Sequence, residues 1–136
     1  AKGHLELVKE LLKRGASVDL PSSLGETALM QAALNARLSI LLFLLQYSAN
    51  PDLQADYGYT ALMGAALKGQ EASVQALLRA KANPDLQNVD GITALMGAAD
   101  HGHEACVKAL LRAKANPDLQ DENGRTALQR AEIQGH

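Results

Sequence analysis

The sequence predicts an all-α solenoid of stacked helix pairs with short β-hairpin fingers, and two observations support this prediction. The first is composition: 47% of the 136 residues are hydrophobic but only 3% are aromatic. This favours short, closely packed helices over a β-sandwich. The second is self-similarity at a fixed period, the sequence signature of repeat architectures. A glycine and a Thr-Ala-Leu triplet recur every 33 residues, at Gly25, Gly58, Gly91 and Gly124 and at Thr27, Thr60, Thr93 and Thr126.

Each 33-residue unit reads as turn, helix, loop, helix and extended finger. In unit 58–90, Gly58 supplies the turn, because glycine adopts backbone conformations that other residues resist. Thr60 is expected to cap the first helix by accepting a hydrogen bond from a backbone N–H. The second helix carries an apolar stripe and is predicted to end at Asn83-Pro84, because the residue before proline avoids the α region. Helices this short are marginal alone, so stacking must stabilise them.

The register of the repeat divides the chain into parts of one predicted domain, residues 1–136. Half a repeat covers 1–24, full repeats cover 25–57, 58–90 and 91–123, and half a repeat covers 124–136. Solenoids normally carry polar capping repeats, and neither end shows one. We therefore expect a fragment of a longer array or of a multidomain protein.

The recurring pattern Gly-x-Thr-Ala-Leu, Ala-Ala, Gly-His, Val-x-x-Leu-Leu and Ala-Asn resembles ankyrin repeats over the whole chain. The resemblance implies an ankyrin-repeat solenoid that binds another protein. One departure is the family's Thr-Pro-Leu-His segment, where this chain has alanine for proline and, in three units, methionine for histidine. Methionine cannot donate the hydrogen bond of that histidine, so less rigid fingers are expected.

A second departure is the family's glycine after the second helix, which survives only as Gly15. Ser48, Lys81 and Lys114 replace it in the other units. A non-glycine residue in a left-handed cap conformation costs roughly 1 kcal/mol, so each replacement is expected to reduce stability.

Composition and charge argue against several partner classes. The formal net charge is -2 and the basic residues are scattered, so neither nucleic acid nor an anionic membrane is an expected partner. The longest apolar stretch, Leu38 to Leu45, is too short to insert across a bilayer. Cys106 is the only cysteine, which excludes an internal disulfide and fits the cytoplasm or another reducing intracellular compartment.

Catalysis is not expected from these residues. Cys106 and His103 are the only nucleophile-like pair, but Cys106 falls on a partly packed helix face and His103 is the family's loop histidine. His101, His103 and Glu104 straddle a loop in one unit only, which favours solvated side chains over metal ligands. The sequence therefore predicts no enzyme, no cofactor and no metal site.

A partner-binding surface is predicted from differences between two units. Units 58–90 and 91–123 differ at 9 of 33 positions, and five differences match positions at which ankyrin repeats usually contact partners. Neutral drift at exposed sites explains the same pattern, but two tyrosines beside one finger tip favour an interface. The predicted surface comprises Asp56, Tyr57, Tyr59, Leu67, Lys68, Val89, Asp90, Ile92, Asp100 and His101.

The fingers are also acidic, which suits a partner with apolar anchors and some basic residues, or else forms a solvated rim. The carboxylates are Asp52, Asp56, Asp85, Asp90, Asp118, Asp121 and Glu122.

A possible second surface comprises Leu38, Leu42 and Phe43. Leu42 is in register with lysines and a glutamine and is expected to face outward, whereas Phe43 is expected partly in a gap between helices. The surface suggests self-association, a second contact, or intramolecular docking of host sequence. The alternative function is accordingly a structural or autoregulatory segment that packs against its own host chain.

Overall fold

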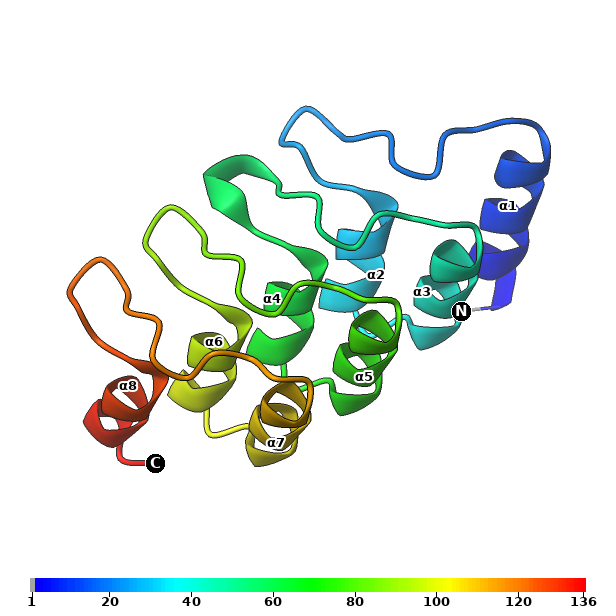
Figure 1. Cartoon of the computed structure of the whole chain (residues 1–136). Helices are drawn as coiled ribbons and strands as arrows, with labels where there is room; N and C mark the ends of the chain where they lie inside the picture. Colours follow the sequence, from blue (N-terminus) through cyan, green and yellow to red (C-terminus); the bar gives the residue numbers. More distant parts are fainter. Residues whose placement is uncertain (1) are drawn as a thin grey trace.

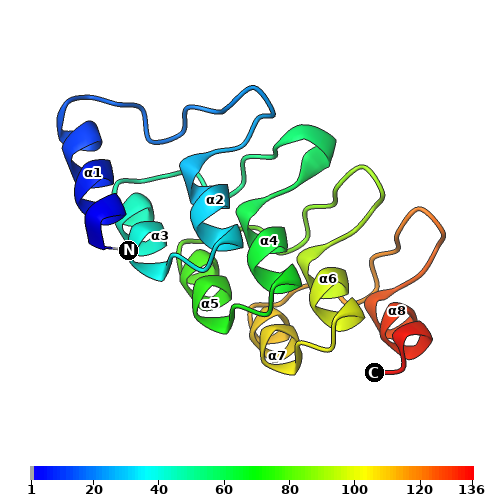
Figure 2. The ribbon, with the colours of Figure 1, turned by 180° about the vertical axis from the view of Figure 1, so that it is seen from behind.

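The protein forms two rows of helices with loops projecting from one side, as seen in a computed structural model that describes residues 2–136 (Figure 1). The first-helix row contains α2 (Ala28–Leu34), α4 (Ala61–Leu67), α6 (Ala94–Asp100) and α8 (Ala127–Gln134). The second-helix row contains α1 (Lys2–Lys13), α3 (Leu38–Gln46), α5 (Glu71–Arg79) and α7 (Glu104–Arg112). Helices contact their neighbours within each row, and α2, α4 and α6 also pack against α3, α5 and α7 (Figure 2). The predicted all-helical solenoid of helix pairs is confirmed.

The fingers are the loops between a second helix and the next first helix, and they are turns rather than the predicted β-hairpins. No strand forms within residues 2–136; the second finger contains one 3-10 turn, η1 (Asp56–Gly58). Two backbone bonds close the second finger: Ala55 N donates to Tyr59 O at 2.7 Å, and Gly58 N donates to Ala55 O at 2.9 Å. Successive tips are joined by a similar bond, such as Val89 N to Tyr57 O at 2.9 Å. Isolated bonds of this kind do not build a strand ladder.

The threonine caps occur as the sequence predicts. In α4, Thr60 Oγ1 accepts a hydrogen bond from Met63 N at 3.2 Å, and the threonines before α2, α6 and α8 do the same. The methionines that replace the family histidine are buried in the core. Finger spacing is held instead by carboxylates: Asp52 Oδ1 accepts from Asn83 N, in the following finger, at 2.7 Å. These bonds link successive fingers without involving the methionine position.

The second helices end earlier than the predicted stop at Asn83-Pro84. Helix α5 ends at Arg79 because Lys81 adopts the left-handed conformation, with φ of 68°. Ala82 N then donates to Leu77 O at 3.0 Å, the bond of a Schellman motif. The expected left-handed residues Ser48 and Lys114 are confirmed by φ values of 63° and 70°.

The core lies between the two rows and follows the repeat. Leu62 of α4 and Leu77 of α5 are buried, as are their equivalents in α2, α6, α3 and α7 and the alanines at the centre of α2, α4 and α6. These alanines let first helices approach closely, which directs the remaining side chains of that row toward the fingers. The surface between the first-helix row and the fingers is formed by core residues such as Met30 together with residues outside the core, such as Leu34 and Tyr59.

Candidate functional site

The tip of each finger is shaped by the residue that begins its turn. In the third finger, Asn88 Oδ1 accepts from the N–H groups of Asp90 and Ile92, both at 2.9 Å. Ser22 and Asp121 make the equivalent pair of bonds in the first and fourth fingers. Such side-chain acceptors fix a turn, and in these three fingers the glycine is the one residue of the turn with positive φ.

The second finger lacks this acceptor because Ala55 occupies the position. Here Tyr57 takes a left-handed conformation, with φ of 64° and ψ of 10°. The equivalent residues Leu24, Asp90 and Asn123 do not have positive φ. A left-handed conformation costs an L-residue about 1–2 kcal/mol, and such strain tends to persist at functional positions. Tyr57 is also 73% exposed, so no core contact explains it.

A groove of about 350 Å³ lies between the first two fingers and helices α2 and α4. The predicted residues Asp56, Tyr57, Tyr59 and Leu67 meet there. Two exposed leucines that the sequence reasoning did not select also line it, Leu24 and Leu34. The signal for them was available, because Leu24 is in register with Tyr57 and Leu34 with Leu67.

A smaller groove of about 150 Å³ follows between the second and third fingers. It is lined by Tyr59, Leu67, Ile92 and Asp100, together with part of Arg130. Tyr59 and Leu67 therefore border both grooves, whereas Tyr57 lines only the larger groove and Ile92 only the smaller one. Four predicted residues line neither groove: Lys68, Val89, Asp90 and His101 are exposed at helix ends and finger tips.

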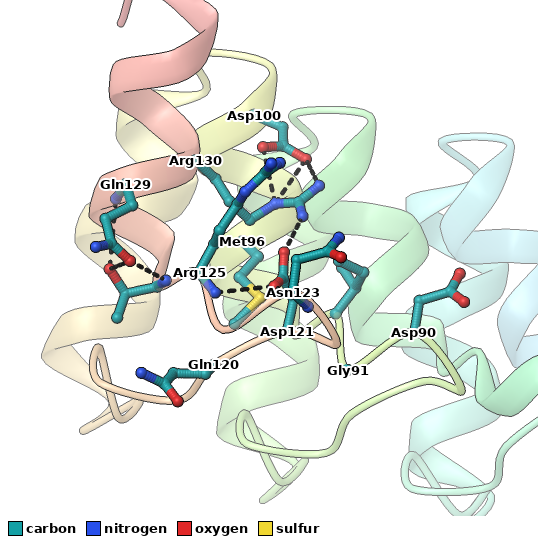
Figure 3. A network of polar contacts seen from close by, with 12 residues as sticks. Asp90, Gly91, Met96, Asp100, Gln120, Asp121, Asn123, Arg125, Gln129 and Arg130 are labelled. Atoms are coloured by element: carbon teal, nitrogen blue, oxygen red, sulfur yellow. Dashed lines mark hydrogen bonds and ion pairs between the residues drawn. The ribbon is translucent and has the colours of Figure 1, made fainter.

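Asp100 belongs to the predicted surface, but its side chain is largely buried and is paired within the protein. Its carboxylate accepts from Arg130 Nε at 3.0 and 3.2 Å, and Arg130 also bonds the buried Asp121 (Figure 3). The Asp100 carboxylate raises the pKa of Arg130. The pKa of Asp121 is lowered, mainly because the Arg125 N–H donates to its carboxylate and further because Arg130 lies beside it. These groups join α6, the fourth finger and α8, so their first role is structural.

A family model for ankyrin repeats (3 copies) matches residues 1–88 and again residues 62–136. The chain belongs to the ankyrin repeat family. Ankyrin repeats generally act as protein–protein interaction modules on a non-catalytic fold. No curated protein matches the chain in sequence. Within residues 2–136, no helix combines the length and the apolar character that crossing a membrane requires.

Several finger carboxylates of this ankyrin array are structural as well. Asp19, Asp52 and Asp85 accept hydrogen bonds from backbone N–H groups in the following finger, at 2.7–3.0 Å. They are unavailable as a simple acidic rim, which corrects the prediction for Asp52 and Asp85. Among the predicted carboxylates, Asp56, Asp90, Asp118 and Glu122 are not in ion pairs within residues 4–136.

The Cys106 and His103 pair does not form a nucleophile. Cys106 is fully buried rather than partly packed, and burial, followed by the nearby Glu71 charge, raises the pKa of its thiol. His103 Nε2 lies 3.0 Å from Leu67 O, so the imidazole bridges successive ankyrin units. Among the described residues, no three His, Cys, Asp or Glu side chains are grouped to hold a metal ion.

The second predicted surface is smaller than expected. Leu42 faces outward and is 49% exposed. Phe43 is half-buried, with its ring 4.7 Å from that of Tyr47 and Lys9 Nζ 5.5 Å from its centre. Leu38 is half-buried against the core. Leu42 and the partly exposed Tyr47 are therefore the apolar groups that this side of α3 presents to solvent.

Proposed function

We propose that this ankyrin array is a scaffold that binds a partner protein between its fingers and first-helix row. The anchors are Tyr57, Tyr59, Leu67 and Ile92. The observation that carries the proposal is Tyr57: a strained conformation holds a tyrosine outward beside a groove. The surrounding contacts are assigned to Asp56, Lys68, Val89, Asp90 and His101.

Exposure supports the choice of anchors. Tyr59 is 46% exposed, and together with Tyr57, Leu24 and Leu34 it forms an apolar patch around one groove. A tyrosine can bury a large flat face at low entropic cost and still offer a hydroxyl to the partner. Truncating an anchor of this kind typically costs about 2 kcal/mol or more of binding.

The test uses a partner recovered by affinity capture and then purified. Tyr57→Ala and Tyr59→Ala should each weaken its affinity at least about 30-fold, with the melting temperature nearly unchanged. Tyr47→Ala is the matched control, because Tyr47 follows α3 in the second-helix row and lines neither groove, so this substitution should leave affinity unaltered. Wild-type affinity in both groove variants would remove this surface.

The alternative is a structural or autoregulatory segment, favoured by the exposure of Leu42 on α3. In that case Leu42 and Tyr47 would contact another part of the host chain. The proposal also places the protein in the cytoplasm or another reducing intracellular compartment, because its one cysteine is an unpaired thiol.

A further inference from the structure

The groove between the first two fingers combines an apolar floor with an acidic rim. Met30, Leu34 and Leu67 form apolar parts of the lining, and Glu26 and Asp56 contribute two carboxylates. Tyr57 and Tyr59 stand on the finger side. No cationic side chain is among the residues that line this groove, all of which lie within residues 4–136.

Neither carboxylate is neutralised. Asp56 has no ion-pair partner among residues 4–136, and Glu26 accepts a hydrogen bond only from the neutral side chain of Gln31. The smaller groove differs, because its Asp100 is paired with Arg130. The first groove therefore carries uncompensated negative charge beside two aromatic faces.

Gly64 lies within this groove, and helix packing does not require a glycine there. An added Cβ would meet the nearest group, Leu34 Cδ1, at 3.8 Å, which is ordinary contact. Alanine is the better helix former, so glycine destabilises α4 without a packing reason. The equivalent positions in α2 and α8 carry long side chains, Gln31 and Arg130, whereas α6 has Gly97, which lines the smaller groove. Glycine keeps the floor of the groove open.

We infer that this groove receives an arginine side chain from the partner protein, an assignment that rests on the proposed function. The methylene stem lies on the apolar floor over Gly64, and the guanidinium reaches the Asp56 and Glu26 carboxylates. Arginine suits the site because its stem is apolar, its planar head stacks on tyrosine rings, and it pairs with carboxylates through several N–H groups.

The test needs no identified partner. The peptide acetyl-Leu-Arg-Leu-amide is titrated into the whole chain, and amide shifts are followed by NMR. Saturable shifts are expected at Tyr59, Gly64 and Leu67. The same peptide with citrulline, which keeps the shape but not the charge, should bind about tenfold more weakly. Absent shifts, or equal binding of both peptides, would overturn the inference.

Two matched pairs of variants sharpen the result. Gly64→Ala should raise the melting temperature by about 3 °C and weaken the peptide about tenfold. Gly97→Ala, at the equivalent position in α6 and outside this groove, should stabilise similarly and leave binding unchanged. Asp56→Asn should weaken the peptide, whereas Glu122→Gln, at the equivalent position in the fourth finger, should not. Equal effects within either pair would contradict the assignment.

The two proposals fail separately. If a purified partner depends on Tyr57 and Tyr59 but the arginine peptide does not bind, the arginine assignment is wrong and the scaffold surface stands. If the peptide binds as expected but neither tyrosine substitution changes the affinity for the partner, the proposed partner surface is wrong. The groove would then bind arginine, but not an arginine of that partner.

Discussion

The substitution Ala55→Asn tests why Tyr57 is strained. Asparagine would give the second finger the acceptor that Asn88 provides in the third, where Asn88 Oδ1 bonds two N–H groups at 2.9 Å. The corresponding donors in the second finger are Tyr57 N and Tyr59 N. With these bonds formed, Tyr57 is expected to leave its left-handed conformation.

The expected gain follows from the structure. Two neutral hydrogen bonds are worth about 1 kcal/mol each, less at an exposed tip, so about 1 kcal/mol together. Relief of the left-handed conformation adds up to about 1 kcal/mol. We therefore expect about 1.5 kcal/mol of added stability and a melting temperature higher by roughly 5 °C.

Calorimetry measures the global effect, and amide exchange of Tyr57 and Tyr59 measures the local one. Asn88→Ala is the matched control and should lose a similar amount, with faster exchange of Asp90 and Ile92. Unchanged amide exchange in Ala55→Asn, together with an unchanged melting temperature, would refute this explanation of the strain. If the partner uses the strained tyrosine, Ala55→Asn should also lower affinity while raising stability.

Further predictions concern stability and the second surface. Arg130→Ala should cost about 2 kcal/mol by chemical denaturation, less than a fully buried pair, because Asp121 keeps two backbone donors. Because the pKa of Asp121 is lowered by folding, its contribution is present above the unfolded value near 4 and is lost as the pH falls through the folded pKa. Asp121→Asn should therefore flatten the acid limb of the stability–pH curve below about pH 4. Lys81→Gly should raise stability by about 1 kcal/mol, which thermal denaturation can measure, because its φ of 68° is left-handed. Leu42→Lys should leave folding intact; unchanged oligomeric state and partner binding would exclude the second surface.

The solenoid could be predicted because its determinants are local and recur. Thr60 caps its own helix, and the residues that pack between units repeat at one interval. The predicted end of the second helix in unit 58–90 is wrong, since the left-handed turn at Lys81, rather than the later proline, determines it. No β-hairpin forms within residues 2–136, because too few backbone hydrogen bonds lie within and between the fingers to make strands. The sequence does not show how many such bonds form.

The candidate site was predicted in part. The register placed Tyr59, Leu67 and Ile92 on neighbouring units, and the structure brings them to one groove. The register could not show which finger carboxylates are free to contact a partner and which are hydrogen-bonded within the protein. Such bonds reach the backbone of the next unit, as Asp52 does with Asn83 N. The sequence prediction does not include the Asp100–Arg130 pair. Both residues differ from their equivalents in the other units, and their opposite charges on successive first helices are the signal for this ion pair.

Departures from the repeat pattern carry different information once their contacts are known. Asp100 and Arg130 satisfy each other, so these departures are explained by stability and say little about a partner. Tyr57 and Gly64 are different, because Tyr57 is strained and Gly64, like Gly97 in the next unit, weakens its helix, and neither improves the packing of this chain. In a repeat protein each unit is a reference for the others, so such a cost can be recognised from a single chain. Because Tyr57 and Gly64 line the same groove, binding of a partner in that groove explains both the strained tyrosine and the helical glycine.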